Sequence, residues 1–270
     1  MKKGNLIIYW DYELQKGGDT SNVGYNDGIE DYNQTEFILK YLKKHDIRTC
    51  FAILGHTAQK GELPYHAPEQ IRQMAEEDHE VGSHTQNHKR ISQISYSHLI
   101  YELQESKKNI EKITRTKCVS FVPPWDKPQY FFGQAIDFKP RTTIPKKSKL
   151  NHQQICLALR KTRYKTYRIC PLTSRINPYK LSKPFKYTGI VNIPCRLSNG
   201  FGINAKKLVK KVVEKKGLAV IYAHPRGLVN PGAQNKVNFI DFIEYLFKLK
   251  ENKKIQIILP NEIARNTFSL

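Results

Sequence analysis

Two histidines four residues apart, His84 and His88, lie in the stretch "EVGSHTQNHKR", which spans residues 80–90. If a helical turn follows the short strand before them, residues i and i+4 lie on one face of that turn. Two imidazoles placed in this way can bind one zinc ion at about 2.0–2.1 Å. The same spacing is also common on the solvated face of a helix. A metal site is therefore predicted only if a third ligand lies nearby.

Two carboxylates follow the first apolar run of the chain, Leu6–Trp10: Asp11 and Glu13. In an extended segment, residues i and i+2 point the same way, so this spacing can direct both carboxylates into one cavity. One of them could complete the metal shell. The other could act as the general base on a metal-bound water, whose pKa falls to about 7 in such sites. The spacing leaves open which carboxylate has which role.

Two further motifs carry groups that could assist an attack by such a water. His224 ends the strongly apolar run in "LAVIYAHPRG", where Pro225 restrains it and where it is placed to protonate a leaving group. The stretch "SFVPPWDKP" predicts a rigid backbone corner. Because proline has no N–H, a donor to an oxyanion at this corner has to come from a following residue such as Trp125.

The elements that must position these residues alternate along the chain. Strand-like runs such as "NLIIYW", "TCFAIL" and "LAVIYAH" are separated by helical patterns such as "SHLIYELQESKKNIEKI" and "VNFIDFIEYLFKLKE". This alternation predicts parallel strands with helical crossovers, that is, a β/α barrel. In such barrels the loops after the strands build the active site. The polar residues that follow the predicted strands are Asp11, Glu13, His56, His84, residues 123–126, Arg196 and His224.

Length and composition agree with a single globular domain over residues 1–270, with a basic, irregular insertion at about 126–190. The five cysteines are scattered and form no CxxC pair, which predicts reduced, mostly buried thiols. No apolar run approaches the roughly 18–20 residues of a membrane helix. The first apolar run is also shorter than the about 7–15 residues of a secretory signal, so a cytoplasmic location is expected.

The formal net charge of +21 is concentrated in one region. Residues 138–213 contain no Asp or Glu but many Lys and Arg, as in "RKTRYKTYR". One interpretation is a solvated basic face. The other is a surface for a polyanion such as an acidic glycan, a lipid-linked phosphate, an anionic membrane or nucleic acid. No zinc-finger, RRM or KH signature accompanies the charge, so no specific nucleic-acid partner is expected.

The acid-containing first strand, "SHTQNH", "FVPPW" and "IYAHP" occur here in an order that resembles the polysaccharide deacetylases of the NodB-homology type, carbohydrate esterase family 4. The resemblance covers nearly the whole chain. The stretches "PYHAPEQIRQMAEEDHEVGSHTQNH" and "SFVPP" are most similar to an intracellular-looking branch of the family. The resemblance implies a distorted (β/α) barrel of about seven parallel strands and one divalent metal ion, usually zinc. It also implies hydrolysis of the acetamido group of N-acetylated sugars.

Carried over by position, the resemblance makes His84 and His88 metal ligands and Asp11 the general base. Glu13 becomes the third metal ligand, although many members have an aspartate one position earlier. Many members also carry an arginine just before the proline motif, which orients the base, and this chain has Val122 there.

The resemblance also implies that His224 is the general acid and that the backbone N–H of Trp125 stabilises the oxyanion. Arg196, in "IPCRLSNG", could supply the missing cation from another strand. Tyr12, Pro124 and Arg196 are the predicted substrate-binding residues.

Three functions are compatible with these features. The first is an N-deacetylase acting on an amino sugar in a polysaccharide or in a lipid-linked or nucleotide-linked precursor, with the basic surface contacting phosphate or an anionic membrane. The second is another C–N hydrolase on the same barrel, acting on a small amide or a cyclic imide. The third is a non-catalytic barrel whose basic face binds a polyanion. Bound metal separates the first from the third, and released acetate separates the first from the second.

Overall fold

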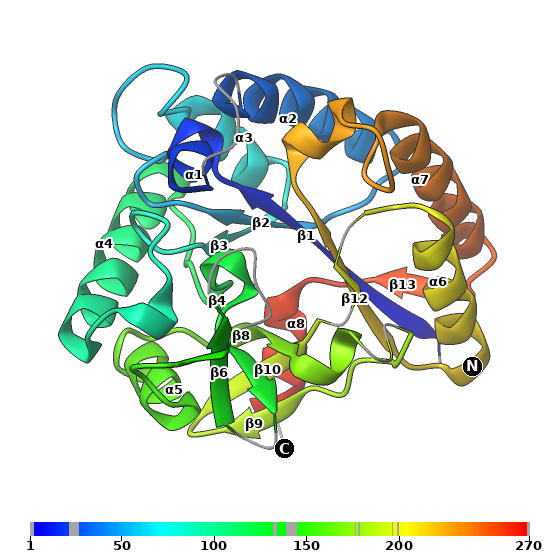
Figure 1. Cartoon of the computed structure of the whole chain (residues 1–270). Helices are drawn as coiled ribbons and strands as arrows, with labels where there is room; N and C mark the ends of the chain where they lie inside the picture. The colour runs from blue at the N-terminus through cyan, green and yellow to red at the C-terminus, as the bar shows by residue number, and fades with distance from the viewer. Residues whose placement is uncertain are drawn as a thin grey trace.

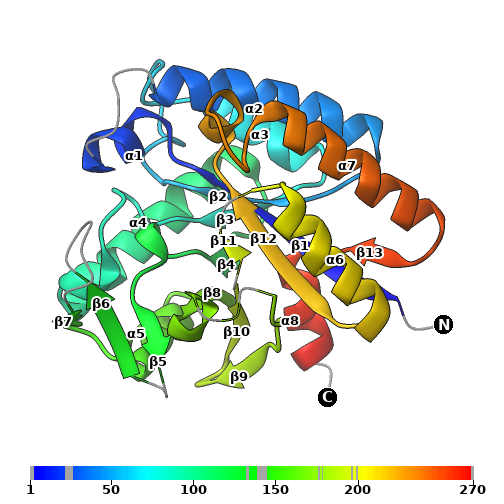
Figure 2. The ribbon, with the colours of Figure 1, turned by 45° about the vertical axis from the view of Figure 1, so that its right-hand side comes forward.

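A computed structural model shows a curled sheet of parallel strands with helices packed around it (Figures 1 and 2). The structure describes residues 3–21, 27–131, 134–138, 145–175, 177, 179–195, 197–198 and 200–268.

The central strands are all parallel to their neighbours. Their spatial order is β12 (Leu218–Ala223), β1 (Gly4–Tyr12), β2 (Cys50–Ile53), β3 (Glu80–Ser83), β4 (Ser120–Phe121), β8 (Thr166–Pro171) and β10 (Ile190–Pro194). β11 (Leu197–Ser198) pairs in parallel with β12, whereas β10 pairs with β8. β10 thus lies at one edge of the central sheet and β11 at the other, although the two strands follow each other in the chain. The two edges of the sheet therefore approach each other. The predicted distorted β/α barrel is confirmed in the form of a curled, half-barrel-like sheet.

The remaining strands extend this sheet. They are β5 (Gln129–Phe131), β6 (Gln134–Phe138), β7 (Pro145–Lys147), β9 (Phe185–Tyr187) and β13 (Ile255–Ile257). β5 pairs with β8 and continues antiparallel into β6 and β7, β9 pairs antiparallel with β10, and β13 pairs with β1.

Helices cover the outside of the curl, as Figure 1 shows. They are α1 (Leu14–Ser21), α2 (Asp27–Lys44), α3 (Pro68–Glu76), α4 (Tyr96–Thr114), α5 (His152–Lys161), α6 (Ile203–Lys215) and α7 (Lys236–Glu251), whereas α8 (Pro260–Phe268) packs inside the curl. Short 3-10 helices span Ile91–Gln93, Pro124–Asp126, Leu172–Arg175 and Pro225–Val229. Local signals start some of the helices: the Ser95 hydroxyl caps α4, and Asn151 with Gln154 forms a capping box at α5.

The predicted irregular insertion at about 126–190 contains the central strand β8, which corrects the description of this region as an insertion; its one predicted helical piece is α5. The many Lys, Arg and Pro residues of this region make the strand "TYRICP" hard to recognise in the sequence, although five of its six residues are buried.

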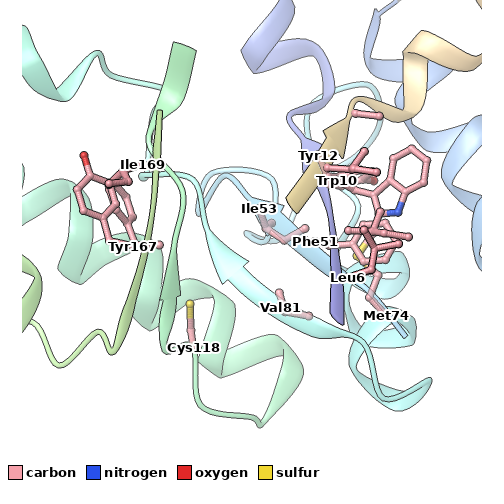
Figure 3. Close-up of a cluster of buried hydrophobic side chains, with 14 of the residues drawn as sticks. Leu6, Trp10, Tyr12, Phe51, Ile53, Met74, Val81, Cys118, Tyr167 and Ile169 are labelled. Carbon is pink, nitrogen blue, oxygen red and sulfur yellow. The ribbon is translucent and has the colours of Figure 1, made fainter. Parts of the chain in front are cut away.

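The alternation of side chains along β1 decides what faces the inside of the curl. Leu6, Trp10 and Tyr12 belong to the hydrophobic core between sheet and helices, and Figure 3 shows them together on one side of the strand. Ile7 and Tyr9 belong to a second cluster, which is formed by residues of β1, β2, β10 and β12 with Val122 and parts of α8. Because side chains alternate between the two faces of a strand, Asp11 lies on the same inner face as Ile7 and Tyr9.

All five cysteines are buried and free, as the sequence predicts for reduced thiols. Burial raises the pKa of Cys118 to about 12, so this thiol is not a nucleophile at neutral pH. Among the described residues, no helix is long and apolar enough to cross a membrane.

Glu80 is a buried carboxylate at the start of β3. It accepts hydrogen bonds from the Ser120 hydroxyl and, at 2.9 Å, from the Asn261 backbone N–H. Burial raises its pKa from 4.5 to about 7, although both hydrogen bonds lower it. Because the raised pKa lies in the folded state, the stabilising contribution of Glu80 is fully present below about pH 4.5. It is lost as the pH rises through 7.

Glu80→Gln is expected to remove this pH dependence. Relative to wild type, the free energy of unfolding of the variant should rise by about 2–3 kcal/mol between about pH 5 and pH 8. Urea unfolding at the two pH values measures the difference. Glu76→Gln, at an exposed position of α3, controls for the loss of one negative charge. An equal pH dependence in wild type and E80Q would contradict the prediction.

Candidate metal centre and active site

Glu13, His84 and His88 form one buried cluster at the C-terminal ends of β1 and β3. The Glu13 Oε1 atom lies 3.3 Å from Nε2 of His84 and 3.2 Å from Nε2 of His88. The three candidate ligand atoms lie within 4.8 Å of one another. The fold therefore brings together the three side chains that the sequence predicts as metal ligands.

The two histidines meet through a loop and not through the predicted helical turn. Residues 84–88 contain no helix, and Thr85 and His88 have φ angles of +70° and +56°. The loop is fixed to α4 because Glu102 accepts hydrogen bonds from the backbone N–H of Asn87 at 2.8 Å and from its side-chain amide at 3.0 Å. The left-handed residues and this anchor bring the ring centroids of His84 and His88 to 5.2 Å.

The protonation pattern of the two imidazoles fits a divalent metal ion. Nδ1 of His84 lies 3.0 Å from the carbonyl oxygen of Val122, so Nδ1 donates and Nε2 keeps its lone pair. Nδ1 of His88 pairs with the Thr20 hydroxyl. Both Nε2 atoms are buried, and within the described part of the chain neither has a hydrogen-bond partner. Two such lone pairs beside a carboxylate are a suitable donor set for Zn²⁺ or a similar ion.

Arg168, in the middle of β8, holds Asp11 in a bidentate ion pair. Both Nη atoms lie 2.7 Å from the Asp11 carboxylate oxygens, and Nη2 also donates to Asp126 at 3.0 Å. The guanidinium is fully buried, and it lies over the ring of Tyr222, with its central carbon 4.2 Å from the ring centroid. Arg168 therefore fixes the orientation of Asp11 and compensates two carboxylates at once.

Sequence reasoning missed Arg168, because it interpreted "RKTRYKTYR" as exposed basic residues. The signal that could have identified it is a single charged residue between apolar neighbours in "YRIC". A cation in the middle of a buried strand needs a carboxylate partner.

Arg226 holds the other oxygen of Glu13. Its Nη2 lies 2.7 Å from Glu13 Oε2, and its Nη1 lies 2.9 Å from Asp31 on α2. Asp31 also accepts from the backbone N–H of Leu14 at 3.0 Å, which fixes the start of α1. Gly17 packs so closely against Glu13 that a Cβ atom there would overlap the glutamate side chain. Oε1 is thus left to face the two histidines.

His224 and Trp125 border the same cluster. Nε2 of His224 lies 3.4 Å from Glu13 Oε1, and its side chain is 26% exposed, so it is accessible from outside. Trp125 has φ +64° and stacks its ring on His88, with centroids 5.3 Å apart. The guanidinium of Arg90 also lies over the Trp125 ring, 5.1 Å from its centroid. The predicted acid and the predicted oxyanion donor therefore lie next to the predicted ligands.

Tyr12 does not belong to the site, which corrects its prediction as a substrate-binding residue. It has no exposed surface, and its hydroxyl donates to Gln70 at 2.7 Å. The pleat of β1 turns Tyr12 toward the helices while Asp11 faces inward. Pro124 is buried in the 3-10 turn before Trp125, where it shapes the rim. Arg196 lies outside the described residues, and the cation beside Asp11 is Arg168.

The electrostatics of the cluster keep both carboxylates ionised. Burial alone would raise the pKa of Asp11, but the Arg168 guanidinium outweighs it and the pKa is lowered. Burial opposes ionisation of Glu13 too, yet its interactions with His88 and with the Arg226 guanidinium hold its pKa well below its usual range. Burial lowers the pKa of His88, which favours the neutral imidazole that a metal requires. The pKa of His224 is raised, because Glu13 outweighs the opposing effects of burial and Arg226.

Comparison with known proteins gives the family. Residues 15–128 match the family described as "Polysaccharide deacetylase", a segment that includes His84, His88 and Trp125. The segment 15–128 is homologous to polysaccharide deacetylases. A curated relative, an uncharacterized 30.6 kDa protein in the fumA 3′ region of Geobacillus stearothermophilus, is 30% identical over 105 residues. That match covers 39% of this chain and 36% of the relative, so it spans about a third of that protein.

Solved deacetylase structures share the fold of this homologue. A putative polysaccharide deacetylase from Mycobacterium smegmatis superimposes with a TM-score of 0.70 at 12% identity, over 100% of this chain and 92% of that one. A family 4 carbohydrate esterase from Streptomyces lividans, solved with acetate, gives a TM-score of 0.51 at 13% identity, over 94% and 92%. A family 4 pseudoenzyme from Bacillus anthracis gives 0.51 at 16% identity, over 95% and 64%. The shared fold thus includes active and inactive proteins.

Removing the cation behind Glu13 is expected to weaken metal binding. Arg226→Met should lower the affinity for zinc by about 10–100-fold, because groups that orient a metal ligand typically contribute that much. Competition with a chromophoric chelator measures the affinity without any turnover. Arg226→Lys, which keeps the charge but not the forked geometry, should lose less. Unchanged zinc affinity in R226M would exclude a role of Arg226 in holding Glu13 for the metal.

Proposed function

We propose that this deacetylase homologue is a metal-dependent hydrolase that removes the N-acetyl group from an amino sugar and releases acetate. The observation that supports it most is the buried cluster of Glu13, His84 and His88. Its Nε2 atoms have no hydrogen-bond partner among the described residues, and His84 and His224 lie close enough to Asp11 to lower its pKa. The match of residues 15–128 to the family supports the same reaction class.

Glu13, His84 and His88 would hold the divalent ion, which we take to be zinc. When bound, such an ion supplies Lewis acidity to an amide carbonyl and lowers the pKa of water to about 7. Asp11, oriented by Arg168, takes the proton of the attacking water. The backbone N–H of Trp125 donates to the oxyanion of the tetrahedral intermediate.

His224 protonates the nitrogen that leaves. Its side chain is partly exposed and lies next to the ligand cluster, so it can reach a leaving amine on the solvent side. The products are acetate and a free amino sugar. The substrate belongs to a polysaccharide or to a lipid-linked or nucleotide-linked precursor, and Pro124 at the rim contributes to its binding.

The test is acetate release by the metal-loaded protein. N-acetylglucosamine oligomers and a nucleotide-linked N-acetylated sugar are incubated with the protein, and acetate is measured by NMR. We expect acetate from at least one of them and none after chelation. Turnover of a cyclic imide without acetate release would replace the proposal by another C–N hydrolase. Absence of turnover on every substrate, with metal bound, would make the chain a non-catalytic member of the fold.

A further inference from the structure

A hollow of about 640 Å³ lies at the end of the sheet opposite to the catalytic cluster. Part of its lining comes from loops that precede strands, with residue 117 before β4, residues 163–165 before β8 and residue 189 before β10, and the rest comes from α4, α5 and β9. The residues of the candidate active site follow β1, β3, β4 and β12. The lower side of Figures 1 and 2 holds the elements around the hollow, α5, β9 and α8.

The charge of this hollow is strongly unbalanced. Six of its ten lining residues are Lys or Arg, and one, Glu111, is acidic. Lys117, Arg160 and Arg163 are exposed, and within the described residues no carboxylate forms an ion pair with any of them. A second hollow of about 570 Å³ shares Lys117 and Lys165 and adds no acidic residue. The two hollows thus form one continuous basic groove.

The backbone that carries these cations is held in place by α4. Lys107 donates to the carbonyl oxygens of Cys118 at 2.7 Å and of Arg163 at 3.2 Å, which ties two loops together. Glu111 accepts from the Cys118 N–H at 2.9 Å. The acid and one of the six cations are therefore used to fix the loops. Of the other cations, Lys117, Arg160 and Arg163 border the hollow without an ion pair to a carboxylate of the described residues, which favours a ligand that they bind.

The side chains that line the groove indicate which class of ligand it binds. Guanidinium and ammonium groups at a concave site suit phosphate oxygens, and arginine binds them in a forked geometry. An exposed aromatic platform, on which unpaired bases would stack, is absent from the described lining, because its one aromatic residue, Tyr164, is buried. We propose that the basic groove binds a ligand with adjacent phosphate groups, either free in solution or at a lipid headgroup.

The test uses two double variants of the full chain. Lys117→Glu with Lys165→Glu reverses two cations shared by both hollows. Lys40→Glu with Lys210→Glu makes the same change in net charge at exposed positions of α2 and α6. Inorganic pyrophosphate is titrated by calorimetry, and vesicles with phosphatidylglycerol are tested beside neutral vesicles by flotation. Thermal unfolding confirms that both variants are folded.

We expect saturable binding of pyrophosphate or of the anionic vesicles to wild type and to K40E/K210E. In K117E/K165E the affinity should fall by about 10²–10⁴-fold, since two charged hydrogen bonds to phosphate oxygens are lost. Pyrophosphate binding indicates a free ligand, and vesicle binding alone indicates a headgroup. Equal loss in both variants, or no binding of either probe, would overturn the proposal. Preference for a single-stranded oligonucleotide, lost in K117E/K165E, would replace it by nucleic acid.

Discussion

Asp11→Asn is expected to lower kcat for acetate release by about 10²–10⁴-fold while the protein keeps its metal. The amide has nearly the same shape and can still accept one hydrogen bond from Arg168, whose two Nη atoms bind the carboxylate in the native protein. It cannot take a proton from water. Steady-state kinetics and metal content are measured on the same preparation.

The control for Asp11→Asn is Asp78→Asn, at an exposed position with φ +59°, which asparagine tolerates. It should leave both kcat and metal content unchanged. If Asp11→Asn loses the metal together with activity, Asp11 is a ligand and Glu13 becomes the candidate base. If kcat falls less than tenfold with the metal retained, Asp11 is not the base.

Arg168→Met is expected to destabilise the fold by about 3–5 kcal/mol and to abolish turnover. Removal of one partner of a buried ion pair leaves the remaining charges uncompensated, and here two carboxylates, Asp11 and Asp126, lose their shared cation. The free energy of unfolding is measured in urea. Turnover is lost because the base is no longer held in one orientation.

A second substitution separates the charge effect from a general packing defect at position 168. Arg168→Met with Asp126→Asn leaves one fewer uncompensated carboxylate and should recover part of the lost stability. Arg168→Lys should be intermediate, since it keeps the charge without the fork. If the double variant is no more stable than Arg168→Met, the uncompensated charge of Asp126 does not contribute to the cost, which then arises from Asp11 or from lost packing against Tyr222.

Local patterns predicted much of the fold and the ligands. The continuous apolar run Leu6–Trp10 predicted the first strand, and it forms the central strand β1, which is buried on both faces. The positions of the acids and histidines after parallel strands also predicted one shared edge, and the resemblance to the family assigned Glu13 as the third ligand; Glu13, His84 and His88 do lie together. The local structure differs from the prediction, because the two histidines meet through a loop with left-handed residues and not through a helical turn.

The groups that orient the carboxylates could not be predicted in the same way. Arg168 lies 157 positions from Asp11, and Arg226 lies 213 positions from Glu13. Such pairs depend on how strands far apart in the chain are placed side by side, which no local period specifies. Arg168 was further hidden among exposed cations of similar sequence, and only its burial in β8 distinguishes it from them.

The measurement that tests the account most directly is the metal content of the purified protein, by elemental mass spectrometry. Wild type is compared with His84→Ala plus His88→Ala, which removes both Nε2 atoms that face Glu13. The account predicts about one divalent ion per chain in wild type and none in the variant. Wild-type protein without stoichiometric metal, even after zinc is supplied, or a variant that keeps its ion, would contradict the metal centre and the hydrolytic mechanism built on it.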